Sequence, residues 1–79
     1  MIYNSKAFAT ALGKLRVQRG LTQDNASALA GISRSHWAAL ESAKKTPRLD
    51  TLWSIAQALG VAPEELVAMV EHEMAKRTQ

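Results

Sequence analysis

The chain has 79 residues, no cysteine and a formal net charge of +3 at pH 7. This length predicts a single domain over residues 1–79, and the lack of cysteine excludes disulfides, thiolate zinc sites and thiol nucleophiles. No apolar run approaches the roughly 18–20 residues of a membrane span and no signal-peptide pattern is present, so we expect a cytoplasmic protein without a membrane partner.

The charges are unevenly distributed along the chain. Residues 1–48 carry eight basic and two acidic side chains, a net charge of +6, whereas residues 49–79 carry two basic and five acidic side chains, a net charge of −3. A basic front half indicates a surface that binds a polyanion, and an acidic back half indicates a face turned away from it. The other interpretation is ordinary solvated helix surface, and charge alone does not decide between the two.

The spacing of the apolar residues predicts five helices and no strand, and therefore an all-α fold. The first helix is expected to begin after Asn4 or Ser5, either of which can cap it, and to end at Gly20. Its apolar residues recur at helical spacing and are Phe8, Leu12 and Leu15.

Residues 22–42 have the pattern of two short helices joined by a tight glycine turn. Thr22 can cap the first of these helices, and Gly31 suits the left-handed turn that ends it. Ser33 can cap the second. This layout is a helix-turn-helix, whose second helix can enter the major groove of DNA. The apolar positions of the two helices are Ala26, Leu29, Ala30, Trp37 and Leu40.

Two further helices are expected in the back half. The first starts near Leu49 and Asp50 and ends at Gly60, and Leu49 begins its apolar stripe. The second covers about residues 63–77, because Pro63 suits a first helical turn.

Trp53 lies off the main apolar stripe of its helix. An exposed indole beside the apolar residues of the last helix would form a patch suited to a partner helix. The alternative is that Trp53 folds over its own domain. We expect residues 63–77 to be a dimerisation helix, with an interface made by Trp53, Leu66, Val67, Val70 and Met74.

Several short motifs occur together over about residues 11–66. They are Leu15-Arg16, Arg19-Gly20-Leu21-Thr22-Gln23, Ala30-Gly31-Ile32-Ser33, Glu41, Pro47, Thr51-Leu52, Ile55-Ala56 and Ala58-Leu59-Gly60-Val61. In this order and spacing they resemble the phage-repressor and Cro-like (XRE-type) helix-turn-helix family. The resemblance implies a five-helix, lambda-repressor-like domain that binds operator DNA as a homodimer and regulates transcription, in the cytoplasm and associated with the nucleoid.

The resemblance also implies which side chains meet DNA. Arg34 opens the recognition helix, and arginine can donate two hydrogen bonds to guanine, although a phosphate contact or a solvated charge would also fit. Many relatives have a long, base-reading side chain where this chain has Ala39, so we expect little direct readout and a larger contribution from DNA shape. The expected base contacts are Arg34, Ser35, Ala38 and Ala39, and the expected phosphate contacts are Thr22, Gln23, His36, Lys44 and Lys45.

Two further features follow from the resemblance. Relatives that have Arg16 and Glu41 join them in a partly buried salt bridge, which ties the first helix to the recognition helix. The family usually has glycine where this chain has Ala43. Because a left-handed residue other than glycine costs roughly 1 kcal/mol, we expect the loop to turn differently here.

Catalysis has little support in the sequence. His36 and His72 lie on different expected helices, without the spacing of a metal site, and there is no phosphate-binding glycine loop. We therefore expect no enzyme, no metal and no cofactor. The leading interpretation is a transcription regulator, either a controller of a restriction–modification system or a phage or mobile-element repressor. The alternative is an interaction protein, an antitoxin whose main role is to neutralise a toxin partner.

Overall fold

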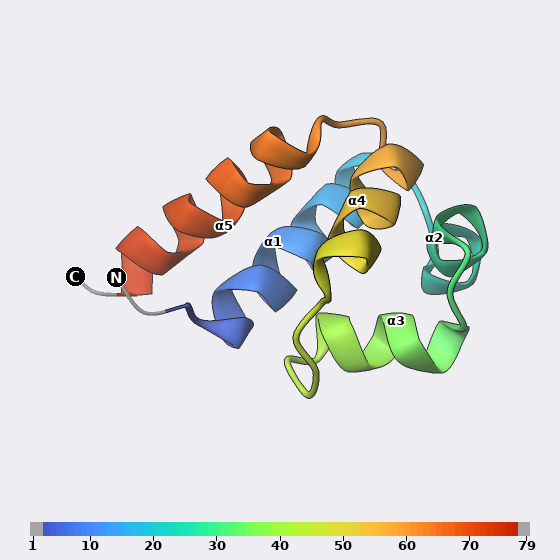
Figure 1. Cartoon of the computed structure of the whole chain (residues 1–79), viewed down its shortest axis with the longest axis horizontal. Helices are drawn as coiled ribbons and strands as arrows, with labels where there is room; N and C mark the ends of the chain where they lie inside the picture. The colour runs from blue at the N-terminus through green and yellow to red at the C-terminus, as the bar shows by residue number, and fades with distance from the viewer. Residues whose placement is uncertain (1–2, 78–79) are drawn as a thin grey trace.

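Five α-helices follow one another in residues 3–77, which are the residues that the computed structural model describes (Figure 1). No strand occurs in that part of the chain, so the prediction of an all-α fold is confirmed. The helices are α1 (Ser5–Gln18), α2 (Gln23–Ala30), α3 (Arg34–Glu41), α4 (Leu49–Ala58) and α5 (Pro63–Arg77).

Side-chain caps fix the starts of the first three helices. Asn4 caps α1, Thr22 caps α2 and Ser33 caps α3. In each case the side-chain oxygen accepts a hydrogen bond from a backbone N–H two or three residues further on. Such a cap stabilises a helix by about 1 kcal/mol. The sequence therefore located these three starts correctly.

Four helices end with a left-handed residue. Beyond that residue, backbone N–H groups bond back to carbonyls in the last helical turn, which satisfies groups that the helix itself leaves unpaired. Three of these left-handed residues are glycines and the fourth is an alanine. The four residues, with their φ angles, are Gly20 (69°), Gly31 (72°), Ala43 (66°) and Gly60 (72°).

Every helix contributes to one hydrophobic core. Two apolar residues expected on buried stripes, Leu29 and Leu49, are instead exposed. On α2 the buried face consists of small residues, Ala26, Ser27 and Ala30, and Leu29 points elsewhere. The largest fully buried side chains are Phe8, Leu12, Trp37, Leu40, Ile55, Leu59 and Leu66.

Figure 1 shows α1 and α4 between α5 and the pair formed by α2 and α3. α3 packs against α2 and α1, whereas α5 packs against α1 and α4. The loop after α3 projects beyond the body of the molecule (Figure 1). No helix in residues 3–77 has the length and apolar character needed to cross a membrane. The arrangement leaves part of α3 accessible, with Arg34 and Ser35 exposed and His36, Ala38 and Ala39 half-buried.

Candidate nucleic-acid interface

The turn between α2 and α3 is held in place by hydrogen bonds within the helix pair. Gly31 takes the left-handed conformation that ends α2, and the N–H of Ile32 donates to the carbonyl of Ser27 at 3.1 Å. The Ser27 side chain is buried, and its hydroxyl donates to the carbonyl of Asp24 at 3.0 Å. These bonds end α2 and begin the turn that leads to α3.

The two faces of α3 differ in chemistry. Trp37 and Leu40 point into the core and are fully buried. The opposite face carries Arg34 and Ser35, which are exposed, with half-buried His36, Ala38 and Ala39 beside them. The residues that we expected to contact bases therefore lie together on the accessible face of one helix.

Arg16 and Glu41 form the ion pair that the resemblance implied. Nε of Arg16 donates to Oε1 of Glu41 at 2.7 Å, and Nη2 donates to Oε2 at 3.2 Å. The third guanidinium nitrogen, Nη1, donates to the carbonyl of Leu21 at 2.6 Å. One arginine of α1 therefore holds both the end of α3 and the approach to α2.

Glu41 also accepts hydrogen bonds from two other side chains. Nε2 of Gln23 donates to Oε2, and Nε1 of Trp37 donates to Oε1 at 3.3 Å. Burial by itself would raise the pKa of Glu41, but the hydrogen bonds from Arg16, Gln23 and Trp37 outweigh it and lower the pKa below its ordinary value. The carboxylate therefore stays ionised. We call these four residues the Glu41 network.

The Glu41 network orients Gln23, which was expected to bind phosphate. A carboxamide nitrogen carries two hydrogens, so Nε2 of Gln23 keeps one to donate after it bonds Glu41. Thr22 precedes it as the exposed cap of α2. Thr22 and the Gln23 carboxamide therefore lie together at the N-terminus of α2.

The loop after α3 carries two exposed cations, Lys44 and Lys45. Both of their backbone N–H groups donate to the carbonyl of Ala39, at 2.9 and 3.2 Å. The expectation that this loop turns differently because of Ala43 is wrong. Ala43 adopts the left-handed conformation itself, at a φ of 66°, because the hydrogen bonds around it fix the turn.

Two residues near the site were not predicted. Asp24 in α2 lies against Arg34, with Oδ1 3.1 Å from Nε. Gly13 in α1 faces Glu41: a Cβ added there would lie 3.6 Å from Cγ of Glu41. A glycine inside a helical pattern is a sign of close approach and could have indicated this contact. No feature of the sequence singled out Asp24.

Residues 12–66 match the helix-turn-helix family. The chain belongs to this family. The predicted resemblance to XRE-type helix-turn-helix proteins is therefore confirmed. Members of the family are transcription regulators and not enzymes. Within residues 3–77, no three or more His, Asp or Glu side chains are grouped so that they could hold a metal ion.

Two relatives of this helix-turn-helix protein and one protein of the same fold illustrate the match. An uncharacterized HTH-type transcriptional regulator, y4dJ, of Sinorhizobium fredii is 39% identical over 62 residues, which are 78% of this chain and 80% of that protein. The restriction-modification controller protein C.AhdI from Aeromonas hydrophila is 31% identical, with a TM-score of 0.76 over 78% of this chain and 94% of its own. The clp gene regulator ClgR from Corynebacterium glutamicum is 23% identical and shares the fold, with a TM-score of 0.88 over 94% and 79% of the two chains.

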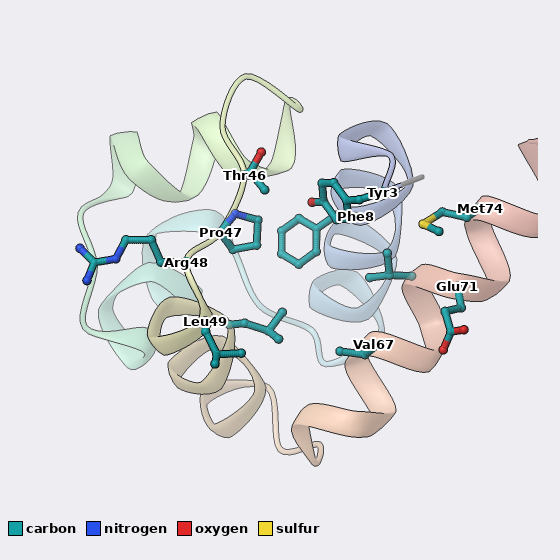
Figure 2. Close-up of a pocket in the computed structure, with 11 residues that line it drawn as sticks. Tyr3, Phe8, Thr46, Pro47, Arg48, Leu49, Val67, Glu71 and Met74 are labelled. Atoms are coloured by element: carbon teal, nitrogen blue, oxygen red, sulfur yellow. The ribbon is translucent and has the colours of Figure 1, made fainter. Parts of the chain in front are cut away.

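The helix-turn-helix protein has an apolar groove on the side of α4 and α5. The groove has a volume of about 440 Å³ and lies between the N-terminal segment, the loop after α3, α4 and α5. Figure 2 shows Phe8 and Pro47 at its centre, with Arg48 and Glu71 extending away from it. Its lining residues are Tyr3, Phe8, Thr46, Pro47, Arg48, Leu49, Leu52, Val67, Val70, Glu71 and Met74.

The predicted dimer residues fall into three groups. Trp53 and Val67 are exposed, at 52% and 42% of their surface. Val70 and Met74 are mostly buried but line the groove. Leu66 is fully buried in the core, so its assignment to an interface is wrong. Its side chain faces inward because α5 packs against α1 and α4 through that face.

Polar contacts fasten α5 to α1. Nζ of Lys14 lies 2.7 Å from Oε2 of Glu73, and the hydrogen bond from Lys14 lowers the pKa of Glu73 below its ordinary value. Arg77 donates to the hydroxyl of Thr10 at 2.8 Å. These contacts add polar links between α5 and α1 to the packing of the two helices in the core.

Proposed function

We propose that this regulator binds operator DNA as a homodimer, with α3 of each copy in the major groove. The observation that carries the proposal is the two-faced character of α3. Its inner face is buried through Trp37 and Leu40, while its outer face is accessible and is followed by exposed Lys44 and Lys45. A helix presented in this way, with cations at its end, fits the major groove and the adjacent phosphates.

Base recognition falls to four side chains in this proposal. Arg34 donates two hydrogen bonds to a guanine, which contributes about 1–3 kcal/mol of discrimination against other bases. Ser35 meets a base edge, and Ala38 and Ala39 offer methyl groups to thymine methyls. Because Ala38 and Ala39 make no hydrogen bonds through their side chains, DNA shape supplies the remaining specificity.

The residues proposed to bind phosphate lie on α3 and on the segments beside it. Thr22 and Gln23 lie at the N-terminus of α2, where N–H groups favour an anion. His36 is half-buried on α3, and Lys44 and Lys45 are exposed in the loop that follows it. The Glu41 network supports the proposal because it fixes the N-terminus of α2 against the end of α3. Affinity that depends on such contacts falls steeply as salt concentration rises.

A second copy of the chain completes the site. An α-helix rises 1.5 Å per residue, so the eight residues of α3 span about 12 Å. Base pairs are stacked about 3.4 Å apart, so one α3 reaches only about four of them. Two copies related by a two-fold axis would read half-sites about 34 Å apart. The apolar groove, with exposed Trp53 and Val67 beside α4 and α5, offers the surface for that pairing.

Among regulators of this kind, we propose a controller of a restriction–modification system. C.AhdI, a controller by name, is 31% identical and is matched over 94% of its length. A phage or mobile-element repressor is the second candidate. Neither y4dJ nor C.AhdI is called an antitoxin, so the comparisons do not support that alternative.

DNA binding is tested by selection of bound duplexes from a random pool, followed by affinity measurements at two salt concentrations. Lys45→Ala should weaken binding to every sequence by a similar factor, roughly threefold to tenfold. The slope of log affinity against log salt concentration should become shallower by about one, which corresponds to the loss of one phosphate contact. Arg34→Ala should remove the preference for guanine at one position of each half-site. Lys76→Ala is the matched control, because it removes the same charge from α5.

Two results would overturn the proposal. One is an affinity of the unaltered protein for duplex DNA that does not change with salt. The other is an equal loss of affinity for Lys45→Ala and Lys76→Ala, since that would mean that the cation beside α3 has no special role.

A further inference from the structure

The guanidinium of Arg34 lies against a carboxylate from the other helix of the helix-turn-helix. Arg34 is the first residue of α3 and Asp24 is the second residue of α2. Nε of Arg34 is 3.1 Å from Oδ1 of Asp24. The contact is an ion pair and not a hydrogen bond, and the guanidinium donates no hydrogen bond to any residue in the described part of the chain. Asp24 is therefore the one acidic side chain within ion-pair distance of the candidate base reader among residues 3–77.

The stability of the fold does not explain this ion pair. The side chains of Arg34 and Asp24 are 66% and 70% exposed. An ion pair so open to water gains little, because the solvent screens it and both side chains lose freedom. Asp24 also suits the positive end of α2, but that interaction does not require Arg34.

Asp24 is an unusual charge for its surroundings. Asp24 and Glu41 are the two acidic residues among residues 1–48. Glu41 is almost enclosed by its network, whereas Asp24 is exposed. An exposed carboxylate beside a proposed DNA-binding helix repels phosphates, so it should weaken binding to all sequences unless it has a compensating role.

We propose that Asp24 is a positioning residue that sets the specificity of Arg34. By attracting the Nε side of the guanidinium, the carboxylate leaves Nη1 and Nη2 to donate to O6 and N7 of a guanine. The side chain then loses less conformational freedom on binding DNA, because part of that freedom is already lost in the free protein. The proposal rests on the DNA-binding function proposed above.

The test compares affinity for the selected duplex with affinity for one in which the guanine read by Arg34 is replaced. Asp24→Asn should reduce the preference for guanine roughly fivefold, whereas Asp24→Glu, which keeps the carboxylate, should retain more of it. With Arg34→Ala already present, Asp24→Asn should change affinity for both duplexes by the same factor. Circular dichroism establishes that each variant is folded.

Asp50→Asn is the matched control. It removes the same charge from another exposed pair, Arg48 and Asp50, whose Nε and Oδ1 atoms are 3.4 Å apart at the start of α4. It should leave the preference for guanine unchanged.

The outcomes separate the two proposals. If the unaltered protein prefers the selected duplex but Asp24→Asn changes both affinities equally, the positioning role is overturned and DNA binding stands. If Arg34→Ala leaves the preference intact, Asp24 has no base reader to position, and its role is likewise overturned. If the unaltered protein does not bind duplex DNA, both proposals fail.

Discussion

Ala43 holds a backbone conformation that the chain elsewhere assigns to glycine. Gly20, Gly31 and Gly60 occupy the same position at the ends of α1, α2 and α4, with nearly the same φ. An L-residue with a Cβ in this conformation is strained by roughly 1–2 kcal/mol. The turn persists at Ala43 because Lys44 and Lys45 bond back to Ala39. The strain lies directly before the two lysines proposed to bind phosphate.

We expect Ala43→Gly to stabilise the protein by about 0.5–1 kcal/mol, since relief of strain exceeds the entropy that glycine adds to the unfolded chain. For a domain of this size that raises Tm by about 2–8 °C. Thermal unfolding followed by circular dichroism measures the change.

Gly31→Ala is the control for Ala43→Gly, because it introduces an alanine at a positive φ instead of removing one. A Cβ at Gly31 would meet nothing within 4 Å, so its effect comes from the positive φ alone. It should destabilise the protein by about 1 kcal/mol. A lower Tm for Ala43→Gly would mean that Ala43 is not strained.

The contacts of some single residues could be predicted from the sequence, and those of others could not. Arg16 and Glu41 are 25 positions apart, and only the family resemblance indicated that they meet. The contact between Asp24 and Arg34 could not be found in the same way, because it depends on the angle between α2 and α3. Ala43 was identified as a departure, but the sequence does not show whether hydrogen bonds or strain decide the turn.

At the scale of the elements, Glu41 links three helices through one ionised carboxylate. Its folded pKa lies below the ordinary value of 4.5. Such a group stabilises the fold above its unfolded pKa, and this stabilisation is lost as pH falls through the folded pKa. α1, α2 and α3 should therefore be held together less firmly in acid.

We expect the free energy of unfolding to decrease as pH falls from about 5 to about 3, and Glu41→Gln to show a shallower decrease. At neutral pH this variant should already be less stable, by about 3 kcal/mol, because it leaves Arg16 partly buried without its counter-charge. Urea unfolding at a series of pH values measures both effects.

The contribution of Glu73 to the pH dependence of stability must be measured separately from that of Glu41. Its pKa is also lowered, chiefly by the hydrogen bond from Lys14, so it loses stabilising charge in the same acidic range. Glu73→Gln measures its share. A Glu41→Gln protein with the pH dependence of the unaltered chain would contradict the role given to Glu41.

The helices themselves were largely predictable. Caps at Asn4, Thr22 and Ser33 and breaks at glycines gave most of their ends. Whether a particular apolar side chain points into the core was harder to predict. Leu29 and Leu49 fit helical periodicity but are exposed. Periodicity gives the spacing of a stripe but not which neighbouring helix covers it, and α2 is too short for its few apolar residues to define one face.

At the scale of the whole molecule, the proposed contacts with DNA and with a second copy use different helices. α3 packs on α2 and α1, whereas α5 packs on α1 and α4 (Figure 1). The exposed surface of Val67 adjoins the apolar groove (Figure 2). A charge introduced at Val67 should therefore affect pairing of two copies without altering α3.

We expect Val67→Lys to weaken the proposed dimer at least tenfold, because pairing would bury an ammonium group without a partner. Sedimentation at micromolar concentration should then detect monomer. Val17→Lys is the matched control, since Val17 is exposed on α1 and does not line the groove. Equal dimer affinities for the two variants would show that this groove is not where copies meet.

The loop after α3 belongs to both surfaces. Lys44 and Lys45 are followed directly by Thr46, Pro47 and Arg48, which form one wall of the groove. A second copy bound in the groove would contact the same short segment that positions the two lysines. The protein concentration would then determine how many copies are paired and also how firmly the lysines are held for binding to phosphates.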